Sequence, residues 1–534
     1  FTSVAPTVSV GDAVVVGGMV TEFRAGGVAS ENLTVTEISA PTVAVLSSGN
    51  ALPPPIVIGT GGRVPPTAVI EDDAISDVET GGVFDPASDG IDFYESLEGM
   101  RVQVNAPVAV GPTSSNGEIP VIGDNGANAS VRTTRGGIVV RPEDFNPERI
   151  ILDDGISGGP AIPLVNVGDR FAAPAIGVLD YSFGNYKLEV SEPLGMVSGS
   201  LTPETATPAT ASQLAVATFN VENLAPGDGA AKFNTLAGMI VNNLKAPDIV
   251  ALEEIQDNNG ATNDGTVDAT TTYNTLIAAI TAAGGPSYQF RQIDPINGQD
   301  GGEPGGNIRQ GFLFRVDRGL SFTDRPGGTA LAATTVISSG VDTHLSFSPG
   351  RIDPTNSAFS SPSGSRKPLA GEFMFNGHKL FVIANHFNSK GGDQPLYGRF
   401  QPPTRSSETQ RHQQAQIVHD FVQSILAADP SAAVVVLGDL NDFEFSETLA
   451  TLSAGVLHDL ISTLPQSERY TYVFEGNSQA IDHILLSDYL KVRPLAYDVV
   501  HVNSEFATQA SDHEPQVVRL SFGSVLNYLP LVRR

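Results

Sequence analysis

The stretch AVVVLGDLNDF, residues 433–443, is an apolar run of strand length that leads directly into Asp439 and Asn441. A short, continuous apolar run is typical of a strand that is buried on both faces. Open α/β sheets place their functional sites where such strands end. We therefore predict a buried strand over residues 433–438 and a functional site at its carboxyl end.

The same pattern recurs over residues 213–522, where short apolar runs alternate with stretches of helical periodicity. The apolar runs are LAVATF (214–219), DIVAL (248–252), GFLFRV (311–316), LFVIA (380–384), AVVVLG (433–438), DHILLS (482–487) and PQVVRLSF (515–522). Apolar residues repeat every three or four positions in 233–244, 271–285 and 406–430, which predicts helices there. Strands that alternate with helices indicate an α/β domain.

Most of these apolar runs begin or end at residues suited to metal binding or proton transfer. These residues are Asn220, Glu253, Glu254, Asn385, His386, Asp439, Asn441, Asp482, Ser511, Asp512 and His513. One polar residue at a strand end is ordinary loop chemistry. The residues named above lie at six strand ends of one domain, and each of these ends carries Asp, Glu, Asn or His. Six such ends favour a single shared site.

The first 200 residues contain strand-like runs without helical periodicity. The runs at 13–23, 31–38, 42–48, 99–110 and 137–143 are bounded by turn residues, and 175–190 has the pattern of a hairpin. We predict an all-β, OB-like N-terminal domain over residues 1–200. A Pro/Thr-rich linker is predicted over 201–212, and residues 523–534 form a C-terminal tail.

Two motifs of this first region are predicted to be loops. The acidic stretch 69–90 is expected to be a solvated excursion, with a calcium site as the alternative. GISGG, residues 155–159, matches the letters of the nucleophile elbow of hydrolases. That elbow needs a strand before it and a helix after it, whereas Asp154 precedes this stretch and Pro160 follows it.

The composition excludes several kinds of site. The chain has no cysteine, and therefore no disulfide, thiol nucleophile or zinc–thiolate centre. It carries 59 acidic and 30 basic residues, and 26 of the acidic but only 9 of the basic ones lie in the first 210 positions. Most Lys and Arg residues thus lie where a phosphate-bearing substrate needs them. No apolar run approaches the ~18 residues of a membrane span, and an N-terminus at Phe1 is what processing would leave.

Six motifs resemble, in order and spacing, those of the endonuclease/exonuclease/phosphatase superfamily, which includes pancreatic-type DNases, abasic-site endonucleases and bacterial sphingomyelinases. The motifs are TFNVEN (218–223), LEEIQD (252–257), NHFNSKGG (385–392), LGDLNDF (437–443), IDHILLS (481–487) and SDHEP (511–515). The chain looks most similar to bacterial extracellular nucleases that carry an OB-like N-terminal module. This resemblance implies an α/β four-layer sandwich for residues 213–522.

The resemblance also implies a role for each matching residue. The implied catalytic residues are His386, Asp439, Asn441, Asp482 and His513, and the implied metal-side residues are Glu254, Asp512 and Asn220. The implied cofactor is Mg²⁺ or Mn²⁺. In this scheme Asp439 and Asn441 position the water and the phosphate, and Asp482 pairs with His513. Which histidine acts as base and which as acid stays open.

Further candidates for substrate and ion binding lie near these motifs. Arg309 and Lys390 are candidates for binding the substrate phosphate. The stretch 257–268 has acidic and amide side chains spaced like those of a calcium loop, with a hydrogen-bonded turn as the alternative. The candidate calcium ligands are Asp257, Asn259, Asp264 and Asp268.

One expected acid is missing from the sequence, and another acid lies next to Glu254. Animal DNases pair their first catalytic histidine with a glutamate just before the strand that matches 311–316. The corresponding stretch NIRQGFLF (307–314) has no acid, so the group that orients His386 stays open. Glu253 neighbours the metal-side Glu254, and we expect it to lie at the surface.

These observations predict a secreted, extracellular bacterial enzyme that hydrolyses phosphodiester bonds of DNA with Mg²⁺ or Mn²⁺, and with Ca²⁺ as an additional ion. RNA as substrate and association with the cell surface are alternatives. A second reading is a phosphodiesterase that acts on lipid head groups or small phosphoesters. A third is a non-catalytic extracellular matrix or DNA-binding protein. No oligomeric state is predicted.

Overall fold

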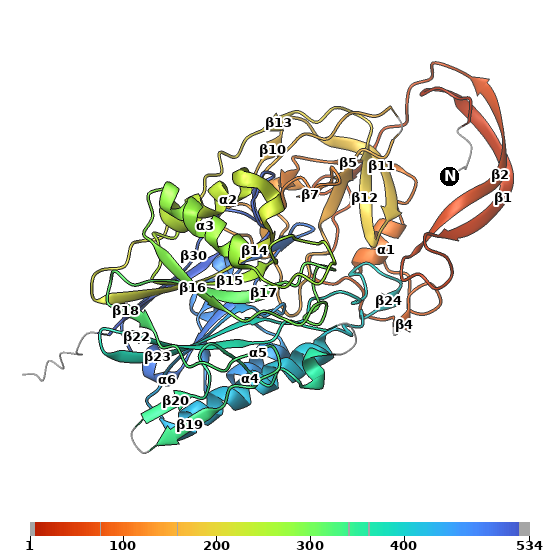
Figure 1. Cartoon of the computed structure of the whole chain (residues 1–534). Helices are drawn as coiled ribbons and strands as arrows, with labels where there is room; N and C mark the ends of the chain where they lie inside the picture. Colours follow the sequence, from red (N-terminus) through yellow and green to blue (C-terminus); the bar gives the residue numbers. More distant parts are fainter. Residues whose placement is uncertain (1–5, 75, 157, 340–341, 361–363, 523–534) are drawn as a thin grey trace, which may run out of the picture. The chain divides into compact units, whose positions relative to one another are not determined.

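The computed structural model describes residues 6–74, 76–156, 158–339, 342–360 and 364–522 (Figure 1). The chain divides into two compact units. The first unit comprises Phe1–Leu201 together with Gly392–Ser406 and Phe474–Ser478. The second comprises Thr202–Gly391, Ser407–Val473 and Gln479–Arg534. Two short segments from the second half of the sequence therefore belong to the first unit.

The first unit is built on a nine-stranded sheet with the order β13-β10-β6-β7-β9-β12-β11-β5-β3. Its strands are β3 (Ile56–Ile58), β5 (Arg101–Val104), β6 (Val108–Ala109), β7 (Ile119–Ile122), β9 (Ile150–Asp153), β10 (Arg170–Phe171), β11 (Ala175–Ser182), β12 (Asn185–Val190) and β13 (Met196–Val197). The remaining elements are β1 (Ala13–Arg24), β2 (Thr34–Ser47), β4 (Ser76–Asp77), α1 (Gly90–Glu95), η1 (Asp124–Gly126), β8 (Ile138–Val139), β24 (Phe400–Gln401) and β28 (Asn477–Gln479).

The strand content of the first unit follows the sequence patterns only in part. The predicted hairpin at 175–190 is present as β11 and β12. The runs 31–38 and 42–48 form the single strand β2, and 99–110 divides into β5 and β6. The unit is not all-β, because α1 packs Ile91, Phe93 and Tyr94 into its core. Among the described residues, the strand order runs from β13 to β3, and these two end strands do not pair with each other. The OB-like barrel therefore stays a prediction.

The second unit contains two mixed sheets. The six-stranded sheet has the order β16 (Tyr288–Gln292), β17 (Arg309–Arg315), β15 (Ile249–Ile255), β14 (Gln213–Leu224), β31 (Gln516–Ser521) and β30 (Leu495–Val499). The seven-stranded sheet has the order β18 (Leu320–Phe322), β22 (Leu369–Phe375), β23 (His378–His386), β25 (Ala433–Asp439), β29 (Asp482–Leu486) and β26 (His458–Asp459), and β21 (Gly350–Arg351) joins β22. In each sheet one central pair is parallel: β14 with β15, and β23 with β25.

The two sheets pack face to face, and helices cover their outer faces (Figure 1). The core between the sheets takes apolar residues from both, including Val216 and Phe312 from one and Val382 and Val435 from the other. The outer helices are α2 (Gly229–Gly238) and α3 (Thr270–Ala282) on the six-stranded sheet, and α4 (Glu408–Ala428) and α5 (Glu447–Ser453) on the seven-stranded sheet. The predicted α/β arrangement of layers is therefore present.

Shorter elements complete the second unit. They are η2 (Pro226–Asp228), η3 (Met239–Asn243), β19 (Val336–Ser339), β20 (Asp342–Leu345), η4 (Ser357–Phe359), η5 (Ile461–Thr463), η6 (Gln466–Glu468), β27 (Tyr472–Phe474) and α6 (Asp488–Lys491). The predicted linker at 201–212 has little regular structure, and its Ala206 is buried in the core beneath α2 and α3. The predicted tail at 523–534 and Ser157 of the GISGG stretch lie outside the described residues. Across the described ranges, every helix is too short or too polar to cross a bilayer.

A fully buried ion pair fixes the turn that follows β25. The Arg411 guanidinium on α4 donates from Nε to Asp442 Oδ2 at 2.9 Å, and both side chains are 0% exposed. The Thr448 hydroxyl at the start of α5 donates to the same carboxylate oxygen at 2.6 Å. Asp442 lies within the stretch 433–443, and its side chain stabilises the turn through these two contacts. It ties two helices to the strand end that carries Asp439.

We expect Arg411→Met to lower the free energy of unfolding by about 3–5 kcal/mol, because it leaves the Asp442 carboxylate buried without its partner. The control is Lys379→Met, which breaks an ion pair whose other member, Asp342, is 54% exposed. That change should cost no more than about 1 kcal/mol. Urea unfolding followed by circular dichroism measures both. Equal losses in the two variants would contradict the role of the buried pair.

Candidate active site

The ends of the two parallel strand pairs carry the predicted site residues. His386 is the last residue of β23 and Asp439 the last residue of β25, and the parallel register places them side by side. Antiparallel pairing with β29 then sets Asp482 opposite Asp439. Asn220 and Glu254 lie on the parallel strands β14 and β15 of the other sheet. All five belong to the second unit.

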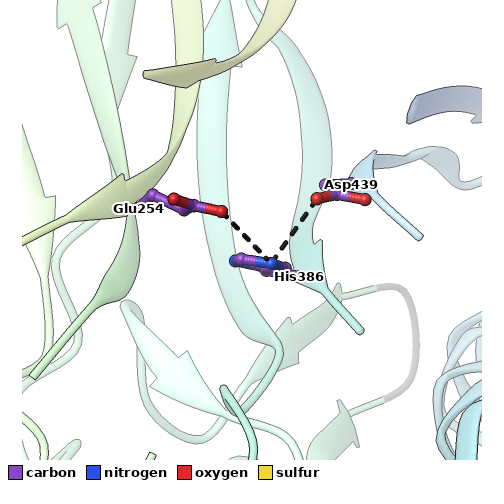
Figure 2. A group of neighbouring side chains, drawn as sticks. All are labelled: Glu254, His386 and Asp439. Carbon is purple, nitrogen blue, oxygen red and sulfur yellow. Dashed lines mark ion pairs between the residues drawn. The ribbon is translucent and has the colours of Figure 1, made fainter. Parts of the chain in front are cut away.

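Glu254, His386 and Asp439 form one group of converging side chains (Figure 2). The His386 Nε2 atom lies 3.5 Å from Asp439 Oδ2 and 3.7 Å from Glu254 Oε1. The Asn220 amide donates to both carboxylates, at 3.0 Å to Glu254 and 3.1 Å to Asp439. Asn220 therefore orients the two acids across the gap between the sheets.

Asp439 also belongs to a second group, with Asp482 and His513. His513 Nδ1 lies 2.8 Å from Asp482 Oδ2, and His513 Nε2 lies 3.8 Å from Asp439 Oδ2. The carboxylate of Asp482 thus fixes the ring, and the other nitrogen faces the first group. Asp512 lies beside this group with 34% of its side chain exposed, and its Oδ1 is 3.8 Å from His513 Nε2.

The two histidines have opposite electrostatic surroundings. Burial lowers the pKa of His386 well below its usual value, and the nearby Arg366 and His513 act in the same direction. Burial opposes the charged form of His513 as well, but Asp482, Asp512 and Asp439 outweigh it and raise its pKa well above the usual value. These surroundings favour the neutral form of His386 and the protonated form of His513.

The carboxylates of the site suit a hard divalent cation. Burial raises the pKa of Asp439, and the charges of Asp482 and Glu254 raise it further against the opposing charge of His513. The charged form of Asp439 therefore gains from any cation placed beside it. Oxygen donors from Glu254 and Asp439 that converge in this way fit Mg²⁺ or Mn²⁺.

Asn441 and Lys390 lie next to this cluster. The Asn441 backbone N–H donates to Asp439 Oδ1 at 2.8 Å, and its side-chain amide donates to the Phe387 carbonyl at 3.3 Å. Asn441 holds a left-handed φ of 52°, and Glu254 holds one of 61°. Such backbone costs about 1–3 kcal/mol at a non-glycine residue and is often found at functional sites. Lys390 Nζ donates to the Asn441 carbonyl, which places its charge at the rim of the site.

The structure does not support the prediction that Arg309 binds the substrate phosphate. Arg309 is 1% exposed, and its guanidinium bonds to the carbonyls of Val267 and Asn307 and to Asp294 at 2.8 Å. These contacts turn its N–H groups inward, away from a substrate phosphate. Arg309 instead holds the 257–268 loop in place.

The loop forms a hydrogen-bonded turn, and a calcium site at this loop stays a prediction. Asn259 donates to Asp264 Oδ2 at 2.8 Å, and the backbone N–H of Thr266 donates to its other oxygen. Asp268 accepts from Thr270 and Asn258, and Asp257 accepts from Asn259 and Asn307. Within the described ranges, these acids do not join any group of three or more converging carboxylates and histidines.

Sequence reasoning misplaced Glu253 and missed Arg366. Glu253 is 0% exposed rather than at the surface, and it accepts from the Thr218 hydroxyl at 2.9 Å. Burial raises its pKa well above the usual value, which favours the neutral carboxyl. Arg366 is buried close to His386 and donates to the Phe387 carbonyl. Among the residues that the structure describes, none forms a hydrogen bond with His386 Nδ1, and the stretch 307–314 supplies no glutamate for this atom.

Two known families match separate parts of the sequence. The endonuclease/exonuclease/phosphatase family matches residues 217–513, and a domain of unknown function matches residues 57–199. No curated protein matches the sequence.

Several solved structures are similar to part of the chain. A humanised TDP2 from D. rerio is 19% identical, with 58% of this chain and 99% of that chain covered and a TM-score of 0.36. An endonuclease/exonuclease/phosphatase from Bacteroides vulgatus is 16% identical, with 58% and 98% covered and a TM-score of 0.35. A mannosyl-6-phosphatase from Bacteroides thetaiotaomicron is 18% identical, with 58% and 100% covered and a TM-score of 0.36. The family match spans more than half of the residues, and the chain therefore belongs to the endonuclease/exonuclease/phosphatase family.

Proposed function

We propose that this protein is a secreted, metal-dependent nuclease that hydrolyses phosphodiester bonds of DNA, with RNA as the alternative substrate. The family acts on phosphoester bonds, which sets the reaction class. One observation carries the proposal: Asp439 lies within 4 Å of both His386 and His513, so one carboxylate faces two histidines whose pKa values are shifted in opposite directions. The extracellular location rests on the resemblance to bacterial extracellular nucleases. Immunodetection in culture medium against cell lysate tests it.

The chemistry requires charge neutralisation at the phosphate, an aligned water and a protonated leaving oxygen. Glu254 and Asp439 would hold a divalent cation, with Asp512 at the exposed side. When bound, Mg²⁺ or Mn²⁺ supplies Lewis-acid neutralisation of the phosphoryl oxygens. Asn220 contributes by holding both carboxylates in one orientation, because its amide donates to each of them.

The two histidines divide the proton chemistry. Protonated His513, fixed by Asp482, points Nε2 toward Asp439 and can donate to a phosphoryl or leaving oxygen bound there. Neutral His386 has its Nε2 within 4 Å of Asp439 and Glu254, where it can accept a proton or orient the attacking water. This division assigns the acid role to His513 and the base role to His386.

We expect His513→Ala to lower kcat on plasmid DNA by about 10²–10⁴-fold, the usual contribution of a positioned acid or base. EDTA should abolish cleavage by the wild type, and Mg²⁺ or Mn²⁺ should restore it. His458→Ala is the matched control, because this histidine is 45% exposed and pairs only with the exposed Asp488. Gel assays on plasmid, single-stranded DNA and RNA measure all three proteins.

Three results would overturn the proposal. Equal cleavage by wild type and His513→Ala would remove the assigned site. Hydrolysis of bis(p-nitrophenyl) phosphate without cleavage of any nucleic acid would favour a phosphodiesterase for small substrates or lipid head groups. Binding of DNA without turnover in any divalent metal would favour a non-catalytic protein.

We expect Lys390→Met to raise KM for DNA and to reduce the slope of log KM against log salt by about 1, the value for one lost phosphate contact. Lys379→Met removes the same charge from the pair with Asp342 and should leave KM and slope unchanged. KM measured at several NaCl concentrations makes the comparison. An unchanged slope in Lys390→Met would show that Lys390 does not contact the substrate backbone.

A further inference from the structure

The acidic stretch of the first unit is more than a solvated loop. Between Arg63 and Arg101 the chain has 10 acidic residues and no basic one. The structure brings five of these acids together in two groups whose ligand atoms converge within 4.8 Å. One group is Glu71, Asp73 and Asp89, and the other is Asp85, Asp89 and Asp92. Asp89 is therefore the shared centre of the cluster.

Asp89 has the surroundings of a ligand that lacks a protein partner. Its side chain is 0% exposed, and no hydrogen-bond donor of the described chain reaches either carboxylate oxygen. It occupies the N-cap position of α1, where an aspartate usually accepts from the first turn, but it makes no cap hydrogen bond. The carboxylate instead faces Asp85 and Glu71. A buried carboxylate without donors costs several kcal/mol unless a cation or a proton compensates it.

The surrounding acids are held in place by backbone donors. Glu71 Oε1 accepts from the N–H groups of Asp73 and Ala74 at 3.0 and 2.9 Å. Asp73 Oδ1 accepts from the Val83 N–H at 2.8 Å. These bonds engage one oxygen of each acid and fix the direction of the other.

The start of α1 supplies the other side of the cluster. Asp92 Oδ2 accepts from the Asp85 N–H at 2.6 Å, which joins the helix to the end of the acidic stretch. Among the residues that the structure describes, no Lys or Arg forms an ion pair with any of the five acids. Burial first, and then the carboxylates of Asp85 and Glu71, raise the pKa of Asp89 to about 8. A single proton would relieve Asp89 but leave four further carboxylates facing one another.

We propose that Glu71, Asp73, Asp85, Asp89 and Asp92 form a Ca²⁺-binding site that ties the acidic stretch to the start of α1. The two groups of three carboxylates, which share Asp89, offer only oxygen ligands, and Ca²⁺ takes six to eight oxygen ligands in proteins. Mg²⁺ prefers to keep most of its water and is bound by one or two carboxylates. The site lies within the first unit and is separate from the catalytic cluster, so it goes beyond the proposed nuclease function.

The site would stabilise the first unit, because α1 contributes Ile91, Phe93 and Tyr94 to its core. Calorimetric titration of the EDTA-treated full chain with Ca²⁺ tests the proposal. We expect one Ca²⁺ site whose affinity falls by more than about 100-fold in Asp89→Asn, since loss of a ligand exceeds the 10–100-fold effect of an outer partner. The wild type should also gain thermal stability with Ca²⁺, and Asp89→Asn should not.

Asp72→Asn is the matched control, because it removes the same charge from an exposed neighbour that belongs to neither group. Its affinity should stay within about threefold, and Glu254→Gln in the catalytic cluster should leave this site intact. If Asp89→Asn does not fold, Asp85→Asn takes its place in the titration. Unchanged Ca²⁺ affinity in the Asp89 or Asp85 variant would overturn the proposal. So would a wild type that neither binds Ca²⁺ nor is stabilised by it.

Discussion

Asp439 is the residue on which the rest of the site depends. Its carboxylate accepts from Asn220 at 3.1 Å and lies 3.5 Å from His386 and 3.8 Å from His513, so both side-chain groups share it. The position is fixed by the packing of two apolar sheets, because β25 ends at Asp439 in register with β23 and β29. Burying a carboxylate there is costly, and the neighbouring donors and the protonated His513 offset part of that cost.

Residues around the site fix the position of Asp439 and of the side chains next to it. The turn after Asp439 is anchored by the buried pair of Asp442 and Arg411, and Asn441 adopts a left-handed conformation that the turn imposes. Asn220 bridges from the opposite sheet, which makes the distance between the two sheets part of the site geometry. Phosphoryl transfer depends mainly on such positioning of side chains, because the protein takes little part in the covalent steps.

Two acidic stretches of the chain show how hydrogen bonding decides what a carboxylate can do. In the 257–268 loop, backbone and side-chain hydrogen bonds from Thr266 and Asn259 lower the pKa of Asp264, so its charge is already compensated. In the 69–90 stretch, burial and like charges raise the pKa of Asp89, and no donor reaches its oxygens. The Asp264 carboxylate is thus compensated by hydrogen bonds within its loop, whereas the Asp89 carboxylate is surrounded by like charges.

The sequence by itself determined the α/β layers of the second unit and pointed to the polar residues at its strand ends. Both signals are local, because they rest on the period of apolar residues and on the polar residues that follow them. It also showed that 307–314 lacks an acid to orient His386. Tertiary structure alone decided the opposite pKa shifts of the two histidines, the burial of Glu253 and Arg309, and the proximity of Glu71 to Asp89. These depend on desolvation and on contacts between residues far apart in the chain, which spacing does not encode.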